Sequence, residues 1–475
     1  FVNGLPIKMP TISIIGATGF TGSLVAKYLI KNAPLETRIS LVGRSLSKLE
    51  SLKKTLGGTR PLGAVAPDLI VASSEDTASI DNVVSRSTVV VCTAGPFLRI
   101  AGPIVASCAR QGVDYVDITG ETPFVRQTID RHDSTAKETG AFIVNMCGFD
   151  SVPSDLGCWR TVQRARRELG EGTRRVSCFA TMRGALSGGT LESGMEMERD
   201  PNLFRMLKDP FLLGGRPLSA REEDKDVQEA ALLCLPHESS SGAATADTGT
   251  AASADHDGGL WTSVFMMAEL NTRTVRRSHS LFGGLQGGGA GYGSDFGYSE
   301  RMMCGSEGEA AKLARPAPPV GKREAMRSEG RLPKQGEGPS EEQRAKSRFK
   351  FFFVGEGEDS GRRVVTSVSG GDPGYDETAK MVSEAALALA FDRDEMHATK
   401  VAGLKGGVVT PAFAFGEVLE GRLKRAGISL ADEGTIFEPD AKGDQRLRSL
   451  LGTALASDST PKSAPSISEL PTPKL

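Results

Sequence analysis

The chain has 475 residues, of which 39% are hydrophobic and 24% charged, and its formal net charge is −2 at pH 7. This length favours two or three domains rather than one core. A nearly neutral balance excludes both the broad basic surface that binds nucleic acid and the acidic excess of a solvating chain. Partners must therefore be inferred from individual sites.

No run of about 18 apolar residues occurs, so we expect no transmembrane helix. We also expect no signal peptide, and Met9 is a candidate natural start because the first apolar run begins only at Thr11. The seven cysteines form no Cys-x-x-Cys pair and lie mostly in apolar surroundings. This predicts buried, reduced thiols in an intracellular reducing compartment, and the cytoplasm in particular.

Three segments lack the large apolar side chains that a packed core needs. They are residues 236–259, 305–347 and 456–475. Small polar residues fill the first, and charges mixed with Pro and Gly fill the second. We expect two disordered insertions and a disordered tail, because such segments do not bury enough apolar area to offset the entropy of ordering.

Between residues 10 and 150, short apolar runs alternate with stretches of helical spacing. Continuous apolar strands between helices are typical of a parallel sheet that is covered on both faces. The strands that we predict are residues 12–16, 38–43, 69–73, 88–94, 114–119 and 142–147. The pattern predicts an α/β fold, with a doubly wound dinucleotide-binding (Rossmann) domain over residues 9–155.

The stretch GATGFTG ends the first predicted strand and opens the first predicted helix. Gly16 permits a tight turn, Gly19 lets a pyrophosphate approach the backbone, and Gly22 lets the helix pack closely on the strand. The spacing is GxxGxxG rather than GxGxxG, and a turn without a ligand is the alternative. The surrounding strands favour a nucleotide site, whose residues are then Gly16, Thr18, Gly19, Phe20, Thr21 and Gly22.

The end of the second predicted strand selects the nucleotide, since NAD sites place an Asp or Glu there against the ribose 2′-hydroxyl. This sequence has Arg44 and Ser45 at that point, with Lys48 one turn into the next helix. Cationic side chains favour a 2′-phosphate, so we predict NADP(H) as the cofactor. The alternative is that Arg44 and Lys48 are solvated surface charges.

Two turns follow the fourth and fifth predicted strands, at the sheet edge where ligands bind. The first contains Gly95, Pro96 and Phe97, and we expect its backbone to contact the ribose and nicotinamide of the cofactor. The second ends in Glu121, whose polar side chain directly after a buried strand makes it a candidate for substrate binding.

The sixth predicted strand is followed at the same edge by GFDSVPSDLG. Asp150 and Ser151 emerge there as polar candidates. Ser154 and Asp155 come one turn later, and for them N-capping of a helix with Pro153 in its first turn is the favoured interpretation.

The motifs GATGFTG, TAGPF, YVDITGE and GFDSVPSDLG together resemble the saccharopine dehydrogenase-like oxidoreductase family, in the branch that includes the trans-acting enoyl reductases. The resemblance continues in SGGT (187–190), in TVRRSHSL (274–281) and in two stretches between residues 370 and 423. It implies an NADP-dependent oxidoreductase that acts on a lipid-related substrate.

A second, α+β domain for substrate binding or dimerisation is predicted over residues 156–370. Alternation in VSCFATMR, WTSVFMMAELN, FKFFFVGEG and RRVVTSVSG favours a mixed or antiparallel sheet. The stretch TAKMVSEAALALAF has the spacing of a buried amphipathic helix. The resemblance implies that helices of residues 371–455 return to cover the dinucleotide domain.

The implied chemistry is hydride transfer from a nicotinamide, which requires donors for the developing charge and a source of a proton. For an enoyl thioester these groups act at the enolate oxygen and at the α-carbon. No motif assigns them. The candidates are Tyr115, Asp150 and Ser151 for catalysis, and Glu121, Thr190, Arg276 and Arg277 for the substrate. Each also has a structural interpretation, and His132 lies in a predicted surface helix.

Other catalytic classes lack their signatures in this sequence. No Ser-His-Asp order, no metal-ligand cluster and no Tyr-x-x-x-Lys pair is present. We therefore expect neither hydrolysis nor a catalytic metal. The expected partner is a small-molecule or acyl-carrier-borne substrate and not nucleic acid, and a homodimer stays open.

Three functions remain open. The first is NADPH-dependent reduction of an acyl or enoyl intermediate. The second is a low-turnover NADP-binding protein on lipid droplets or membranes, with FMMAEL (265–270), FKFFFVG (349–355) and VVTPAFAFGEVL (408–419) as candidate apolar surfaces, although core packing is favoured for each. The third is a saccharopine-type amino-acid oxidoreductase, which needs a cationic cluster beyond Arg276 and Arg277.

Overall fold

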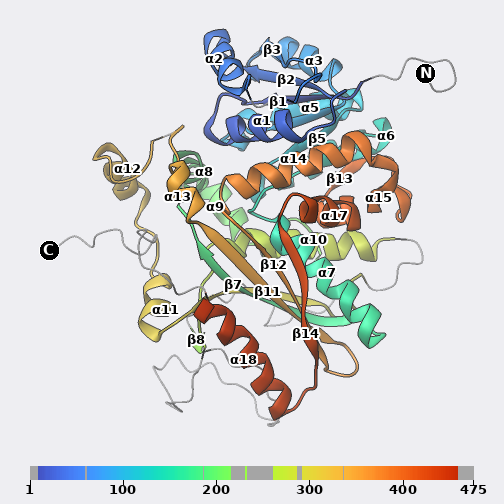
Figure 1. The fold of residues 1–475 in the computed structure, drawn as a ribbon, viewed down its shortest axis with the longest axis vertical. Helices are drawn as coiled ribbons and strands as arrows, with labels where there is room; N and C mark the ends of the chain where they lie inside the picture. Colours follow the sequence, from blue (N-terminus) through green and yellow to red (C-terminus); the bar gives the residue numbers. More distant parts are fainter. Residues whose placement is uncertain are drawn as a thin grey trace.

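The computed structural model describes residues 9–58, 61–185, 187–215, 231–232, 260–285, 291–334 and 336–457. Within these ranges the chain builds two seven-stranded sheets, which lie one above the other in Figure 1. The insertion predicted over 236–259 and the tail beyond residue 457 lie outside the described residues.

The first sheet is parallel, with the strand order β13-β6-β5-β4-β1-β2-β3. Its strands are β1 (Thr11–Ile15), β2 (Arg38–Gly43), β3 (Asp68–Val71), β4 (Val89–Cys92), β5 (Asp114–Asp117), β6 (Phe142–Val144) and β13 (Gly407–Val409). The order 3-2-1-4-5-6 is that of a dinucleotide-binding fold. The predicted α/β class and its six strands are confirmed, whereas β13 was not predicted.

Helices cover both faces of this sheet, as the apolar strands require. They include α1 (Phe20–Asn32), α2 (Leu46–Leu56), α3 (Thr77–Ser85), α5 (Gly102–Gln111), α6 (Thr122–Thr139) and α14 (Asp376–Phe391). Val89 and Val91 of β4 pack in an apolar cluster with α1 and α14, while Val90 and Cys92 pack in another with α3, α5 and α6. Successive side chains of a strand point to opposite faces, so both faces of β4 are buried.

The second sheet is mixed, as predicted, with the order β14-β12-β11-β7-β10-β9-β8. Its strands are β7 (Thr173–Arg183), β8 (Ala231–Leu232), β9 (Trp261–Ser263), β10 (Gly297–Cys304), β11 (Arg348–Gly357), β12 (Arg363–Gly370) and β14 (Ser429–Phe437). β7 pairs parallel with β10 and antiparallel with β11. The helix α7 (Val152–Leu169) packs on β11 and β12 and so joins the two sheets.

The Phe-rich strand β11 is buried on both faces. Phe349, Phe351 and Phe353 belong to the same apolar cluster as α7, whereas Phe352 packs against α18 (Ala441–Ser457) on the opposite face. Phe413 and Phe415 are at most 1% exposed. Core packing therefore explains the runs 349–355 and 408–419, and they form no apolar surface. None of the described helices is both long and apolar enough to cross a bilayer.

Two predictions for the second domain are wrong. WTSVFMMAELN, expected as a strand, forms only β9 before α10 (Ala268–Gly283) begins. A short apolar run does not distinguish a strand from a buried helix. Segment 305–347, expected to be disordered, forms α11 (Glu307–Leu313), α12 (Val320–Ser328) and α13 (Glu341–Ala345).

Ion pairs tie α12 and α13 of this segment to distant helices. Arg327 of α12 pairs with Glu192 of α8 (Gly188–Arg199) over 2.5 Å, and Arg323 pairs with Glu198. In the next helix, Arg344 pairs with Asp376 over 3.0 Å. Composition indicates too little apolar area, but it does not reveal charge partners on a distant helix.

The region 371–455 divides between the two sheets. α14 packs against α1, β4 and β5, which agrees with the expected return to the dinucleotide domain. The short helices α15 (His397–Lys400), α16 (Pro411–Phe415) and α17 (Glu417–Arg425) follow. β14 and α18 instead join the second sheet, so only part of this region covers the first.

Candidate functional site

The glycine-rich turn connects β1 to α1. Gly16 has a φ of +88°, and its N–H donates to the carbonyl oxygen of Val42 over 3.1 Å. Gly19 donates to the carbonyl oxygen of Gly16 over 2.9 Å. A Cβ on residue 22 would lie 2.1 Å from that same Gly16 oxygen. The close approach of helix and strand therefore requires glycine at position 22.

The N-terminus of α1 is open to an anion. Its N-cap is Gly19, and no side chain of the described residues caps the helix. The free N–H groups and the helix dipole favour a phosphate at this point. Thr21 also lines the cavity described below, and Thr18 lies against Gly43 at the end of β2.

Arg44 follows β2 directly. Arg44 and Lys48 are exposed, and neither side chain has an ion-pair partner in the described part of the chain. Ser45 is the N-cap of α2 and accepts a hydrogen bond from the Lys48 N–H over 3.4 Å. Two unpaired cations beside the glycine-rich turn fit a 2′-phosphate.

Glu121 fixes the turn Gly95–Phe97, which leads into α4 (Phe97–Ile100). The N–H groups of Phe97 and Leu98 donate to its two carboxylate oxygens over 2.9 and 2.8 Å, and Ser193 of α8 donates over 2.7 Å. Glu121 is fully buried. Its carboxylate is thus engaged within the protein, so it positions the turn rather than binding substrate, contrary to its candidate role.

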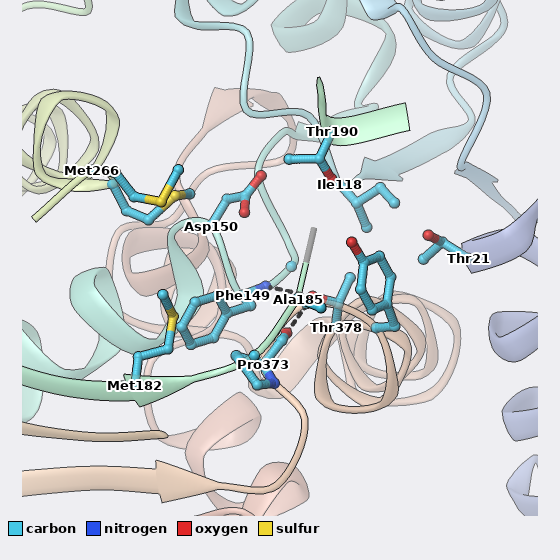
Figure 2. Close-up of a pocket in the computed structure, with 15 residues that line it drawn as sticks. Thr21, Ile118, Phe149, Asp150, Met182, Ala185, Thr190, Met266, Pro373 and Thr378 are labelled. Atoms are coloured by element: carbon cyan, nitrogen blue, oxygen red, sulfur yellow. Dashed lines mark hydrogen bonds between the residues drawn. The ribbon is translucent and has the colours of Figure 1, made fainter. Parts of the chain in front are cut away.

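A cavity of about 700 Å³, counting its open mouth, lies between the carboxyl edge of the first sheet and the second sheet. Its wall comes from α1, from the loops after β5 and β6, from the end of β7 and from the segment before α14. Figure 2 shows side chains of these elements around the space. The cavity is where a ligand of a doubly wound sheet is expected.

Apolar side chains form much of the wall. Met182, Met266, Met267, Phe149 and Ile118 all line the cavity. In Figure 2, Met182 lies beside Phe149, and Ile118 is on the opposite side of the space. No Lys, Arg or His is among the described residues that line the cavity. Flexible methionines accommodate irregular apolar groups, so the cavity suits an uncharged chain better than a substrate with several carboxylates.

Three hydroxyl-bearing residues of the wall differ in the hydrogen bonds that their hydroxyl groups already make. Thr378 accepts from the Phe149 N–H and donates to the carbonyl oxygen of Pro373, each over 3.0 Å, as the dashed lines of Figure 2 show. Thr190 lies 3.3 Å from the Ser187 hydroxyl. Burial raises the pKa of Tyr375, so its phenol stays protonated, and its hydroxyl already interacts with Ser187 and Thr190.

Asp150 follows β6 and lines the cavity, whereas its predicted neighbours turn into the protein. Ser151 is fully buried, and its hydroxyl lies 3.3 Å from both Asn271 and Thr274. Ser151 is not among the described residues that line this cavity, which argues against its candidate role in catalysis. Asp150 does line it and stays a candidate.

Neither Ser154 nor Asp155 is an N-cap. The N-cap of α7 is Ser151, and its side chain makes no capping bond. Asp155 instead accepts from Ser278 of α10 over 2.5 Å and from the N–H of Ala412 in α16 over 2.8 Å. The predicted capping is wrong because the helix begins earlier, which places both residues inside its first turns.

Tyr115 and the two arginines also lie away from the cavity. Tyr115 is fully buried on β5, and its hydroxyl donates to Asp117 over 3.0 Å. Arg276 donates to the carbonyl oxygen of Pro210 over 2.8 Å, and Arg277 to that of Leu213 over 3.2 Å. All three therefore have structural roles, and the two arginines hold the loop after α9 (Pro201–Leu207).

His132 lies on the partly exposed face of α6, as expected, and burial lowers its pKa.

Sequence reasoning missed Tyr375 and the three methionines. Tyr375 stands in GGDPGYDET, a stretch used only for its resemblance, and its ring meets Phe20 edge-on at 5.0 Å between centroids. Glycines and a proline before a helix indicate a turn. They do not indicate that this turn lies against the first helix of the chain.

Comparison with known proteins identifies the family. Residues 12–144 match the family model described as the saccharopine dehydrogenase NADP binding domain. Two proteins with trans-acting enoyl reductase in their names align with this chain, and each alignment covers 96% of that protein and 88% of this chain. The one from Mycobacterium tuberculosis is 34% identical over 440 residues, and the one from Mycobacterium ulcerans 33% over 441. The chain belongs to the trans-acting enoyl reductase branch of the saccharopine dehydrogenase-like family.

Among solved structures, the apo saccharopine dehydrogenase (L-Glu forming) of Saccharomyces cerevisiae is similar over 89% of this chain and 99% of its own, with 12% identity and a TM-score of 0.47. Membership of the family makes the protein an NADP-dependent oxidoreductase.

The site fits NADP(H). Gly22 lets α1 pack closely on β1, the uncapped N-terminus of α1 is open to a pyrophosphate, and the exposed Arg44 and Lys48 offer charge for a 2′-phosphate. The individual contacts of these residues, and of Gly95, Pro96 and Phe97, stay predictions.

Proposed function

We propose that this family member reduces the carbon–carbon double bond of an enoyl thioester. The observation that carries the proposal is the cavity at the carboxyl edge of the first sheet, apolar in its wall and lined by no described cation. The names of the relatives support the same reaction class.

In this proposal the residues of the cavity wall have different roles. The bound nicotinamide supplies a hydride to the β-carbon of the substrate. The methionines and Phe149 hold the acyl chain and exclude water. Tyr375 and Thr190 offer hydroxyl groups to the thioester oxygen, where negative charge develops, while Thr378 holds Phe149 and Pro373 in place.

The proposal extends to how the substrate is presented. The relatives are named as acting in trans, so the thioester belongs to a carrier or a small thiol rather than to this chain. A saccharopine-type substrate carries several carboxylates, and the described wall has no cation to pair with them. The runs 349–355 and 408–419, two of the three candidate lipid-binding surfaces, are mostly buried. In the third, 265–270, Met266 is exposed but also lines the cavity, so we assign this segment to the substrate site rather than to a lipid surface.

The test measures NADPH oxidation with a panel of α,β-unsaturated thioesters on coenzyme A, on pantetheine and on a purified acyl carrier protein. Saccharopine-pathway imines and saturated thioesters serve as controls. We expect turnover with the unsaturated thioesters alone. Turnover with the imines, or NADPH binding with no oxidation by any unsaturated thioester, would contradict the proposal.

A further inference from the structure

Asp150 differs from every other acidic residue around the site. The buried carboxylates nearby are engaged: Glu121 holds the turn before α4, Asp155 joins α7 to α10 and α16, and Asp117 accepts from the Met146 N–H over 2.9 Å. The Asp150 carboxylate makes no hydrogen bond or ion pair with any described residue. Figure 2 shows it beside Met266 and directed toward Thr190 and Ile118.

The backbone around Asp150 is tightly held. Met146 has a φ of 63°, unusual for a residue with a side chain. Asp117 anchors it, since the N–H groups of Met146 and Cys147 donate to the Asp117 side chain and carbonyl over 2.9 and 2.8 Å. The Phe149 N–H is fixed on Thr378, and Val152 donates to Gly148 over 2.9 Å. Strained, well-supported backbone of this kind concentrates at functional sites.

Asp150 lines the same cavity as the start of the cofactor-binding helix α1. Thr21, in the first turn of α1, and Asp150, after β6, line one cavity, so the carboxyl group shares a space with the end of the cofactor site. The next requirement of an enoyl reduction is a proton at the α-carbon, and Asp150 is the one carboxyl group among the described lining residues.

We propose that Asp150 is the catalytic acid that protonates the α-carbon of the substrate. This inference rests on the proposed enoyl reduction. The hydride from NADPH forms a C–H bond at the β-carbon, and the electron pair of the double bond moves onto the α-carbon and thioester oxygen. The O–H bond of Asp150 then breaks, and its proton forms the second C–H bond at the α-carbon. A proton from the solvent, entering at the open mouth, then restores the acid form of Asp150. The net reaction would consume NADPH and one proton and give NADP⁺.

The surroundings of Asp150 suit a proton donor at neutral pH. Burial raises its pKa from the ordinary 3.8 to about 6, and no charged neighbour opposes this. Tyr375, before α14, is the other ionisable group among the described residues of the wall, and it stays protonated. Leu270 of α10 and Gly120 after β5 lie close to Asp150 and carry no charge.

The pH dependence follows from the protonated form. An acid is active below its pKa, so kcat/KM is expected to fall roughly tenfold per pH unit above about pH 6. The affinity for NADPH should show no such fall with pH, because cofactor binding does not depend on the protonation of Asp150. This pair of profiles can be recorded on the wild-type holoenzyme.

The variant Asp150→Asn keeps the size of the side chain and removes the acid. We expect kcat to fall about 100-fold or more, with NADPH affinity unchanged, and the fall of kcat/KM above pH 6 to disappear. The unfolding temperature should not fall and should rise slightly above pH 6, because the amide removes the cost of a buried charge. Asp150→Glu is expected to restore part of kcat. The matched control is Asp394→Asn, the same change at an exposed carboxylate, which should behave like wild type.

Stereochemistry gives a readout that does not depend on rate. With an α-methyl enoyl thioester in deuterated water, the wild type is expected to place deuterium on one face of the α-carbon, and Asp150→Asn on both. If Asp150→Asn keeps kcat within about threefold of the wild type, or keeps both the pH profile and one product configuration, Asp150 is not the acid although the reduction stands. If the wild type reduces no enoyl thioester, both proposals fail together.

Discussion

At the scale of single residues, the cofactor site depends on the absence of a side chain at Gly22. The Gly16 carbonyl oxygen and the Thr93 hydroxyl would lie 2.1 and 2.7 Å from a Cβ there. Both are held, because Gly16 O accepts from the Gly19 N–H and Thr93 donates to the carbonyl of Ile15 over 3.1 Å. The turn cannot move away from an added Cβ without losing these hydrogen bonds. Position 22 therefore requires glycine for a local, steric reason.

We therefore expect Gly22→Ala to lower the free energy of unfolding by roughly 1–3 kcal/mol, as overpacking does, and to weaken NADPH binding more than tenfold. Isothermal titration and chemical denaturation measure the two effects. The control is Gly194→Ala in α8, where a Cβ would meet no atom within 4 Å. Equal effects of the two substitutions would show that the turn does not depend on glycine at this position.

Arg44 is the residue that we predict to select NADPH over NADH. Losing a charge-assisted hydrogen bond costs roughly 1.5–3 kcal/mol, so Arg44→Ala is expected to weaken NADPH about tenfold to a hundredfold. NADH, which lacks the 2′-phosphate, should change little. Arg86→Ala, at an exposed position after α3, is the control for a general loss of charge. Equal weakening of NADPH and NADH by Arg44→Ala would refute the assignment.

At the scale of elements, residues 336–345 lie across the start of α1. The carbonyl oxygen of Glu337 accepts from the Gly188 N–H over 3.1 Å, and the Arg344 guanidinium lies 5.7 Å from the centre of the Phe20 ring. Gly338 fits against that ring, where a Cβ would lie 2.5 Å from its edge. An element expected to be disordered thus supports the first helical residue of the cofactor site.

A side chain at Gly338 should disturb Phe20 and, through it, the N-terminus of α1. We expect Gly338→Ala to weaken NADPH binding severalfold and to lower the free energy of unfolding by about 1–2 kcal/mol. Gly321→Ala in α12 is the control, since a Cβ there meets no atom within 4 Å. Unchanged NADPH affinity in Gly338→Ala would show that this segment does not support the cofactor site.

The elements also show what the sequence can and cannot predict. Apolar runs between helical stretches identified six strands, because a parallel sheet buries both faces of each strand. β13 was missed because three residues become a strand only by pairing with β6, far earlier in the chain. Asp150 was a candidate because it follows a strand at the binding edge. Tyr115, which also looked polar near that edge, points into the core.

The remaining differences at the site have the same cause. Arg276 and Arg277 sit on a helix whose register the sequence did not predict, and that register directs both toward the loop after α9. Tyr375 reaches the cavity because α14 packs against α1, which is a contact between the two ends of the chain. Local patterns predict elements, whereas these placements depend on tertiary packing.

At the scale of the whole molecule, one apolar cluster runs through both sheets. It contains Ile14 of β1, Leu156 of α7 and Phe351 of β11. Because neither sheet has this cluster to itself, we infer that the two sheets unfold together. Asp155 lies at their junction, where α7, α10 and α16 meet. Its Ser278 partner also lies 2.6 Å from the Thr410 hydroxyl at the start of α16.

The charge of Asp155 should make the stability of the whole molecule depend on pH. Burial raises its pKa from 3.8 to about 7, so the folded state favours the neutral acid. The stabilisation from this group is full below about pH 4 and is lost as the pH rises through 7. Ser278 donates to the carboxylate, but it can instead accept from a neutral Asp155 and donate to Thr410, since either hydroxyl of that pair can be the donor. Asparagine then mimics the neutral acid, because its oxygen accepts from the Ala412 N–H and its amide donates to Ser278.

Asp155→Asn is therefore expected to be more stable than the wild type at about pH 8, by roughly 1–4 kcal/mol, and similar to it at about pH 5. Asp155→Ala, which loses both bonds, should be less stable than the wild type by about 2–4 kcal/mol at about pH 5. Its deficit should be smaller at about pH 8, because alanine also removes the buried charge. Denaturant unfolding, followed by fluorescence and by circular dichroism, measures both variants. A lower stability of Asp155→Asn than of the wild type at about pH 8 would mean that Asp155 is held as a carboxylate. In that case the Ser278 hydroxyl and the Ala412 N–H both donate to it, and the asparagine amide would place its own N–H against one of these donors.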